Sequence, residues 1–254
     1  MAVLQDIFDS LCRFAPLELQ LGFDNSGLLV GHLHAQIDKI LVALDITEEV
    51  IEEAIAEHAQ LIVSHHPVIW DPVKSLTDGG GERKLLRMIE NHMAAICMHT
   101  NLDIVQGGVN DVLMSILGAK AEAALDADGC GRVGYLPTAI PLGQFLRSCK
   151  TALNANGLRY YDAGKPVYHL AVMGGSGSDA IEDACRAGCD TYVTSDIKYH
   201  QFQRAMELGI NLIDADHFCT ENPIVPVLAD FLRQQFPGVT CIVSQRHKQL
   251  ISFL

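Results

Sequence analysis

The sequence predicts an α/β protein made of two similar, interlinked α/β lobes, with mostly parallel sheets flanked by helices. Short apolar runs typical of buried strands alternate with amphipathic helical patterns along the chain. Polar side chains follow several of these runs directly, and the strand–helix–strand pattern of the first half returns in the second. The whole chain is expected to form a single family domain, 1–254, with lobes at roughly 1–125 and 126–254.

Composition excludes several classes of protein. A chain of 254 residues with 49% hydrophobic and 19% charged residues can bury a core of its own. Its longest apolar runs are too short to span a bilayer, and no signal peptide is evident, so we expect a cytoplasmic protein. The net charge of −13 argues against nucleic-acid binding. A small anionic substrate stays compatible with this charge, because bound metal ions can reverse the local field.

The eight cysteines are scattered without a CxxC pair or zinc-ribbon spacing. Six of them lie among apolar or helical neighbours, which predicts reduced, buried thiols: Cys12, Cys97, Cys149, Cys185, Cys189 and Cys241.

The first elements follow from apolar spacing and from turn residues. Ile7, Leu11 and Phe14 have helical spacing and predict a packing helix within 1–21 that ends around Pro16. Residues 22–32, GFDNSGLLVGH, are interpreted as a polar turn followed by a short apolar run. Residues 37–44 form a predicted strand, and Thr47 opens the next helix.

Residues 61–67, LIVSHHP, organise the rest of the chain. The aliphatic run predicts a buried parallel strand, and such sheets bind ligands beyond the carboxyl ends of their strands. His65 and His66 can serve one site only where the strand ends, and Pro67 ends it there. The alternative is one ligand histidine beside one hydrogen-bonded structural histidine.

The remaining elements of the first half repeat this arrangement. A loop rich in Asp, Pro and Gly at 71–81 precedes a predicted helix at 82–91, whose basic residues favour a solvated face over a phosphate site. The strand at 94–98 runs into His99 and Asp103, and glycines bound a helix at 107–118. In residues 119–168 the pattern predicts only a glycine-rich turn and a helix near 142–155.

The second half returns to the pattern of the first. Strands are expected at 169–173, 191–194 and 210–213, with helices between them. An offset of about 129 to 130 residues superimposes the two strand–helix–strand patterns and places Asp196 where His66 stands. The last strand runs into residues 214–223, DADHFCTENP, as the earlier strand runs into His99.

The polar residues at these strand ends form the candidate site. They are His65, His66, His99, Asp103, Asp196, His217 and Glu221. Three imidazoles and two carboxylates suffice for a pair of divalent ions with open positions for water and substrate. His217 and Glu221 are four residues apart, which puts both on one face if this segment is helical, although an isolated pair of this kind is more often a surface pair.

The sequence GGSG, which includes Gly174 and Gly175, has two interpretations. Its amides could cradle a phosphate at a helix N-terminus. A tight turn is favoured, because the lysine of a P-loop and the full GxGxxG spacing are missing.

Several motifs together resemble the NGG-interacting-factor-three-like family, whose members are often called GTP cyclohydrolase 1 type 2 homologues. They are FDNSGLLVG at 23–31, LIVSHHP at 61–67, HTNLD at 99–103, GGSG at 174–177, TSDIKYH at 194–200 and DHFCTE at 216–221. Phe23 replaces a frequent tryptophan and Phe218 a frequent tyrosine, and neither change removes a ligand. The chain is also too short for the middle domain of longer relatives.

The resemblance implies a dinuclear metal centre in the cleft between the lobes and a toroidal homohexamer. Its ligands carry over onto His65, His66, Asp103, His217 and Glu221. We therefore predict two divalent ions per chain, which could be zinc, manganese, iron or nickel.

The predicted function is hydrolysis of a nucleotide-like substrate, with a guanine nucleotide as the candidate, through a metal-activated hydroxide. His99 or Asp196 would carry protons, and Lys198, Gly174 and Gly175 would hold the phosphates. The alternatives are a metal-dependent phosphoesterase and a non-enzymatic protein that handles metal or binds partners.

Overall fold

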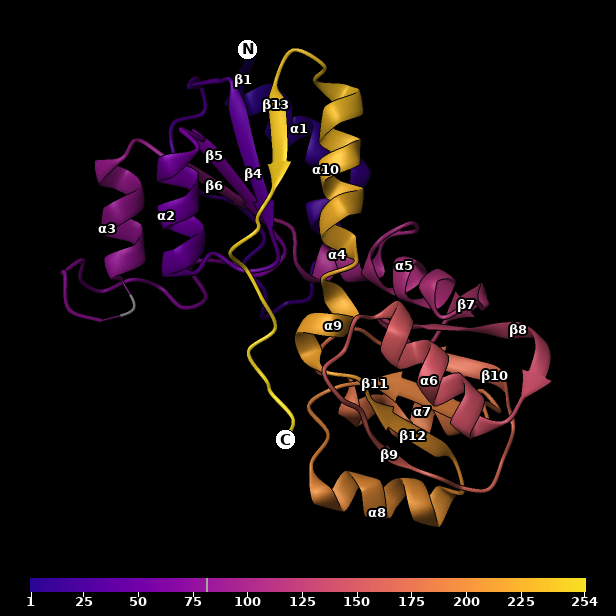
Figure 1. The fold of residues 1–254 in the computed structure, drawn as a ribbon. Helices are drawn as coiled ribbons and strands as arrows, with labels where there is room; N and C mark the ends of the chain where they lie inside the picture. Colours follow the sequence, from indigo (N-terminus) through magenta and orange to yellow (C-terminus); the bar gives the residue numbers. More distant parts are fainter. Residues whose placement is uncertain (81) are drawn as a thin grey trace. The chain divides into compact units, whose positions relative to one another are not determined.

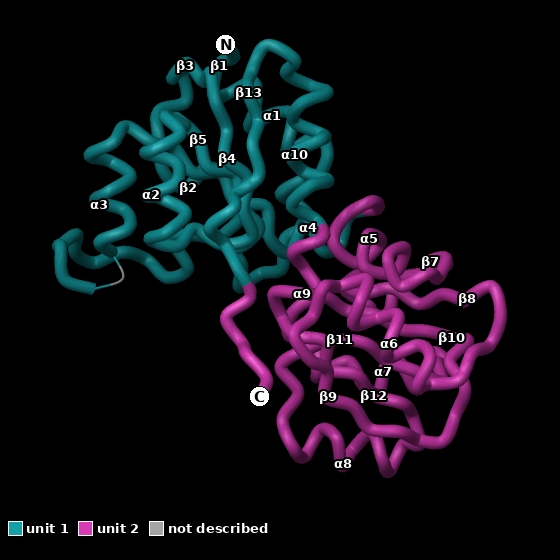
Figure 2. The backbone as a smooth tube through the Cα atoms, viewed as in Figure 1, with its two compact units in different colours: residues 1–105, 224–248 teal, residues 106–223, 249–254 magenta. Residues whose placement is uncertain are grey.

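The computed structural model describes residues 1–80 and 82–254, which form two compact units. Unit 1 consists of residues 1–105 and 224–248, and unit 2 of residues 106–223 and 249–254 (Figure 2). The chain therefore enters unit 2, returns to unit 1 and ends in unit 2. This division differs from the predicted lobes, because residues 106–125 belong to unit 2 and residues 224–248 to unit 1.

Unit 1 is an α/β layer structure. Its elements are β1 (Ala2–Val3), α1 (Leu4–Phe14), the 3-10 helix η1 (Leu17–Leu19), β2 (Gly27–Val30), β3 (Gln36–Ile37), β4 (Lys39–Ala43), α2 (Glu48–Ala56), β5 (Leu61–Ser64), α3 (Arg83–Glu90), β6 (Ala94–Cys97), α4 (Thr100–Ile104), α10 (Ile224–Gln235) and β13 (Thr240–Val243). Helices α2 and α3 lie on one face of the main sheet, and α1 and α10 on the other (Figure 1).

The main sheet of unit 1 has the strand order β13-β4-β5-β6-β2. Strands β13, β4, β5 and β6 run parallel, and β2 pairs with β6 in the antiparallel direction at one edge. Ala43, Ser64 and Cys97 are paired in register at the ends of β4, β5 and β6. The residues that directly follow these three strands therefore lie at the same edge of the sheet.

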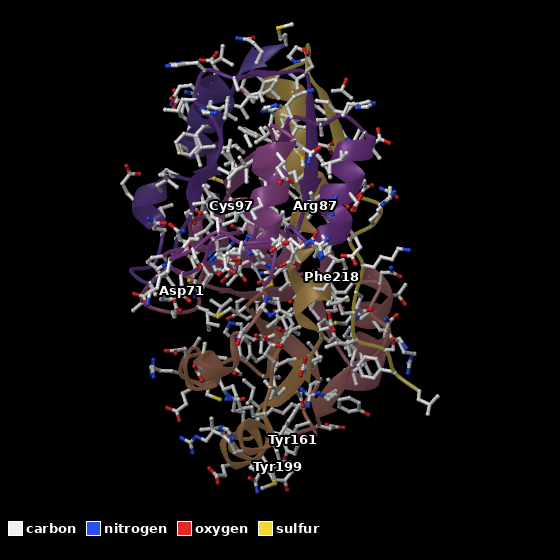
Figure 3. All side chains as sticks on the ribbon, turned by 90° about the vertical axis from the view of Figure 1, so that its left-hand side faces the viewer. Asp71, Arg87, Cys97, Tyr161, Tyr199 and Phe218 are labelled. Atoms are coloured by element: carbon white, nitrogen blue, oxygen red, sulfur yellow. The ribbon has the colours of Figure 1, made fainter. Side chains whose placement is uncertain are left out.

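Strands β5 and β6 are buried at every residue and β4 at every residue after Lys39, so these three strands are buried on both faces, as the apolar runs predicted. Leu41 and Ile62 pack with Val50 and Ile51 of α2 and with Met88 of α3. On the outer surface, Arg87 of α3 forms ion pairs with Glu48 and Glu52 of α2 (Figure 3).

Unit 2 contains a sheet that is mixed, not mostly parallel. Its elements are α5 (Val109–Ile116), β7 (Lys120–Ala124), β8 (Arg132–Ile140), α6 (Leu142–Ala152), β9 (Arg159–Tyr161), β10 (Val167–Val172), η2 (Ser178–Ala180), α7 (Ile181–Arg186), β11 (Thr191–Thr194), α8 (Tyr199–Leu208), β12 (Asn211–Asp214) and α9 (His217–Glu221). The order is β7-β8-β10-β11-β12-β9, in which the neighbours β10, β11 and β12 pair in parallel and the other neighbouring pairs are antiparallel.

The predicted repeat is confirmed for the central strands. Strands β4 and β5 with α2 correspond to β10 and β11 with α7, and each pair of strands is parallel. The antiparallel strands β7, β8 and β9 account for the stretch 119–168, where the sequence has no clear period. Residue 81, the end of the predicted loop 71–81, lies outside the described residues.

All eight cysteines are free thiols, and four of the six predicted to be buried are buried. Cys12 and Cys185 are only partly buried. Cys97 at the end of β6 is buried (Figure 3), and this burial raises the pKa of its thiol to about 11. Within residues 1–80 and 82–254, every helix is too short or too polar to cross a bilayer.

Candidate metal centre

In unit 1, the candidate residues stand at equivalent positions after three neighbouring strands. Asp45, His66 and His99 each follow the last residue of β4, β5 or β6 by two positions. Because these strand ends are in register, the three side chains meet at the carboxyl edge of the sheet.

Three imidazoles form the centre of this cluster. One nitrogen from each of His65, His66 and His99 lies within 4.8 Å of the other two. The ring of His65 is completely buried and donates from Nδ1 to the carbonyl oxygen of Met98 over 2.8 Å. Since a carbonyl can only accept, this bond makes Nε2 of His65 the nitrogen that can bind a metal.

Carboxylates fix the other two rings in the same way. His66 Nδ1 donates to Asp45 Oδ1 over 2.7 Å, and His99 Nδ1 donates to Asp24 Oδ1 over 2.8 Å. Such bonds fix the tautomer and the ring orientation of metal-binding histidines. In both His65 and His66, Nδ1 is the nitrogen bonded to an oxygen acceptor, so the two rings are fixed in the same way.

The residue Asp24 belongs to the stretch that sequence reasoning took for a turn. Its fully buried carboxylate accepts bonds from His99, from Ser26 and from both the amide and the hydroxyl of Thr100. Burial would raise the pKa of Asp24, but the bonds from His99 and Thr100 outweigh burial and hold the pKa well below its usual value.

A second carboxylate, Asp45, was also missed by sequence reasoning. It accepts from His66 through Oδ1 and from His247 through Oδ2, at 2.7 and 3.0 Å. Burial would raise its pKa, but these two imidazoles outweigh burial and lower it well below the usual value. The sequence did contain one signal for Asp45, because this residue follows a predicted strand directly, as the candidate histidines do.

The predicted ligand Asp103 lies on α4, which begins directly after His99. Its Oδ1 is 3.6 Å from Nε2 of His65. With metal–ligand bonds of about 2.0–2.2 Å, two ligands of one tetrahedral ion lie roughly 3.4 Å apart, so this separation suits a shared ion. The half-exposed ring of Trp70 lies 5.5 Å from that of His99, so this residue packs beside the cluster.

Unit 2 brings together Asp196, His217 and Glu221. The segment after β12 is helical, which is the condition under which the spacing puts both residues on one face, and Nε2 of His217 lies 3.0 Å from Glu221 Oε2. Nδ1 of His217 donates to Asp196 Oδ2 over 2.7 Å. Burial would lower the pKa of His217, but Glu221 and Asp196 outweigh burial and raise it to about 9.

The backbone of Gly175 packs against the side chains of His217 and Glu221. A Cβ atom at this position would stand 2.0 Å from Glu221 Oε1 and 3.1 Å from His217 Nε2. Its φ of +63° is also unfavourable for other residues. The glycine is therefore needed for the close approach of the two predicted ligands.

The amides of the GGSG turn are already engaged within unit 2. Gly174 N donates to Asn110 Oδ1, and Gly175 N donates to Thr220 Oγ1. This finding counts against the predicted phosphate role of the two amides and supports the tight turn. Lys198 is exposed at the N-terminus of α8, where its own amide donates to Gln201; its phosphate role stays a prediction.

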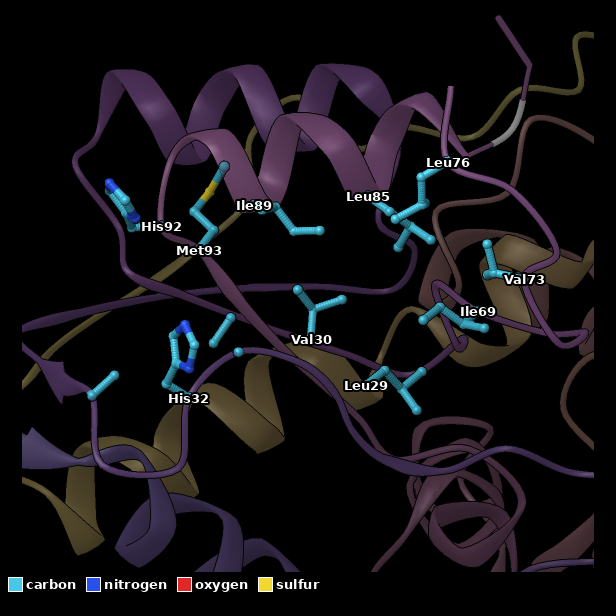
Figure 4. Close-up of a pocket in the computed structure, with 13 residues that line it drawn as sticks. Leu29, Val30, His32, Ile69, Val73, Leu76, Leu85, Ile89, His92 and Met93 are labelled. Carbon is cyan, nitrogen blue, oxygen red and sulfur yellow. The ribbon is translucent and has the colours of Figure 1, made fainter. Parts of the chain in front are cut away.

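A separate apolar pocket of about 460 Å³ lies between α3 and β2 (Figure 4). Aliphatic side chains such as Leu29, Val30 and Ile89 line it, with His32 and His92 at its border. As far as the structure describes its lining, the pocket includes none of the predicted metal ligands.

Comparison with known proteins identifies the family. The family model described as Duf34/NIF3 (NGG1p interacting factor 3) matches residues 2–249. The chain belongs to this family. A Duf34/NIF3 relative from Clostridium perfringens, named GTP cyclohydrolase 1 type 2 homolog, is 36% identical over 99% of both chains. A Helicobacter pylori protein named GTP cyclohydrolase 1 type 2 is 31% identical over 91% of this chain and 92% of its own.

Solved structures show the same Duf34/NIF3 fold. The crystal structure of a Bacillus cereus protein related to NIF3 matches with a TM-score of 0.95 and 24% identity. The superposition covers 100% of this chain and 99% of the Bacillus cereus chain. The fold of the family therefore extends over the whole of this chain.

The donor set of this Duf34/NIF3 chain fits divalent metal ions. Imidazole and carboxylate ligands suit zinc, manganese, iron and nickel. His65, His66, His99 and His217 all donate from Nδ1 to a fixed oxygen, and carboxylates lie near the Nε2 atoms of His65 and His217. The carboxylates of Glu221 and Asp196 favour the protonated form of His217, and metal binding to an imidazole releases such a proton.

The raised pKa of His217 predicts how the stability of the metal-free protein depends on pH. Its contribution is fully present below the unfolded pKa of about 6.5 and is lost as pH rises through about 9. Thermal unfolding in chelator should therefore show a fall in Tm from pH 6.5 to 9.5, and Glu221→Gln should reduce this fall. An equally steep fall in Glu221→Gln would contradict the assignment.

A substitution at Gly175 should disturb the ligand pair. Gly175→Ala is expected to destabilise the protein by about 1–3 kcal/mol and to weaken metal binding, because the methyl group displaces Glu221. Gly164→Ala is the matched control, since Gly164 also has a positive φ but no atom within 4 Å of the position that a Cβ would take. Equal metal affinity in the two variants, measured by chelator competition, would refute the packing role.

Proposed function

We propose that this Duf34/NIF3 protein is a divalent-metal hydrolase of the GTP cyclohydrolase 1 type 2 kind. The ligands of two ions would be His65, His66, Asp103, His217 and Glu221. The observation that carries the proposal is that Nδ1 of each candidate histidine is bonded to a fixed oxygen acceptor. Metal-binding histidines almost always donate their other ring N–H to a carboxylate or a carbonyl, and all four rings here do so.

The names of the relatives support the choice of substrate. Proteins similar over nearly the full chain are called GTP cyclohydrolase 1 type 2, or homologues of it. In that reaction, one water adds to the imidazole-ring carbon of a guanine nucleotide and opens the ring to a formamide. A second water hydrolyses the formamide, so that this carbon leaves as formate and its nitrogen as an amine. When bound, divalent ions would supply Lewis-acid activation of the water and of the ring.

The protein's own residues would then hold and move protons. Asp24 keeps a proton on Nδ1 of His99, so Nε2 of this ring is the atom that can accept or deliver a proton. Asp196 keeps a proton on Nδ1 of His217 and is itself half-exposed. Its contact therefore supports an orienting role for Asp196, and His99 is the stronger candidate for proton transfer.

Metal analysis tests the first part of the proposal. The wild-type protein, stripped and reconstituted with zinc, manganese, iron or nickel, should retain two ions per chain after desalting. His65→Ala and His217→Ala should each retain fewer, whereas His34→Ala should retain two, because His34 is exposed and outside the clusters. Wild-type protein that retains no stoichiometric metal would refute the proposal.

A substrate panel tests the second part. The metal-loaded protein should release formate from GTP. Glu221→Gln should lower the rate of formate release by at least about 100-fold, because it removes a proposed metal ligand. Phosphate release from simple phosphoesters without formate release would instead support a phosphoesterase. Two bound ions with no turnover of either substrate would support a metal-handling protein.

A further inference from the structure

His247 follows β13 and reaches the cluster of unit 1 from the far end of the chain. Its side chain is 8% exposed, and its Nε2 lies 3.0 Å from Asp45 Oδ2. The other oxygen of Asp45 accepts from Nδ1 of His66 at 2.7 Å. The carboxylate of Asp45 is therefore held between two imidazoles, of which only His66 is a predicted metal ligand.

The segment that carries His247 is held in place by a buried carboxylate. Glu53 of α2, 8% exposed, accepts from Ser244 Oγ, Gln245 N and Arg246 N at 2.5, 2.8 and 3.2 Å. Ser244 N also donates to Val42 O, which extends the pairing of β13 with β4. These bonds fix the backbone of residues 244–246, so the approach of His247 to Asp45 is defined by the fold.

We propose that His247 is a positioning residue for the metal ligand His66 and acts through Asp45. The inference rests on the proposed metal-binding role of His66. A carboxylate with a single partner can rotate and exchange its oxygens, whereas two N–H donors on opposite oxygens fix its plane. The fixed plane in turn fixes the ring of His66 and the direction of its Nε2.

A purely structural role of His247 would have a different signature. In that case its loss would lower the stability of the fold without changing the orientation or metal affinity of His66. Positioning through Asp45 requires that the effects of His247 and Asp45 on metal affinity are coupled.

The first experiment measures zinc affinity by competition with a chromophoric chelator. His247→Leu removes the donor to Asp45 and should weaken zinc binding by about 10–100-fold, as for other partners of metal-binding histidines. His247→Gln can still donate from its amide nitrogen and should stay within about threefold of wild type. Gln245→Ala is the control, because this exposed side chain donates to Val243 O and, among the described residues, forms no hydrogen bond with Asp45.

A double-mutant cycle shows whether His247 acts through Asp45. Asp45→Asn alone should weaken zinc binding at least as much as His247→Leu, and the double variant should bind no more weakly than Asp45→Asn. Additive losses, or unchanged affinity in His247→Leu, would overturn the proposal.

The second experiment needs no metal. Imidazole ¹⁵N spectra of wild-type protein freed of metal with a chelator should show His66 protonated at Nδ1. The substitution His247→Leu should shift the His66 signals, whereas Gln245→Ala should leave them unchanged. Unchanged His66 signals in His247→Leu would overturn the positioning role. If wild-type protein binds no zinc but His66 still shifts, the positioning survives and only the proposed metal function fails.

Discussion

The fixed Nδ1 atoms of the candidate histidines are the constraint on which the site depends. An imidazole on a strand end can turn about two torsions, and only a second contact selects one ring orientation and one tautomer. In unit 1 these contacts come from the carbonyl of Met98 and from the carboxylates of Asp24 and Asp45. They can form because β4, β5 and β6 end in register, which brings residues distant in sequence to one edge of the sheet.

The same arrangement is used twice, with different residues. In unit 2, Asp196 and Asp216 follow β11 and β12 by two positions, as His66 and His99 follow β5 and β6. Both aspartates have positive φ angles, 55° and 71°, an uncommon conformation in which a non-glycine residue is mildly strained. Asp196 orients His217, and Asp216 accepts from the amide of Cys219 at the start of α9. The bent backbone thus directs Asp196 toward the predicted ligand His217, and Asp216 caps the helix that carries His217 and Glu221.

Much of this site could be predicted from the sequence, because the strands that carry it are short apolar runs followed by ligand-type residues. The helical relation of His217 to Glu221 was also predictable from their spacing and is confirmed by the 3.0 Å contact. Asp24, Asp45 and His247 were not predicted as site residues. Their roles depend on which strands are neighbours, and His247 reaches Asp45 only because β13 pairs with β4. The bonds of the GGSG amides to Asn110 and Thr220 likewise depend on tertiary contacts that no local pattern encodes.

Anomalous diffraction at the metal absorption edge, from crystals of the metal-loaded protein, tests the central claim most directly. The account predicts peaks about 2.0–2.2 Å from Nε2 of His65, His66 and His217. It also predicts that the Nδ1 bonds to Met98, Asp45 and Asp196 are retained. Peaks remote from these rings, or rings turned to bind through Nδ1, would contradict it.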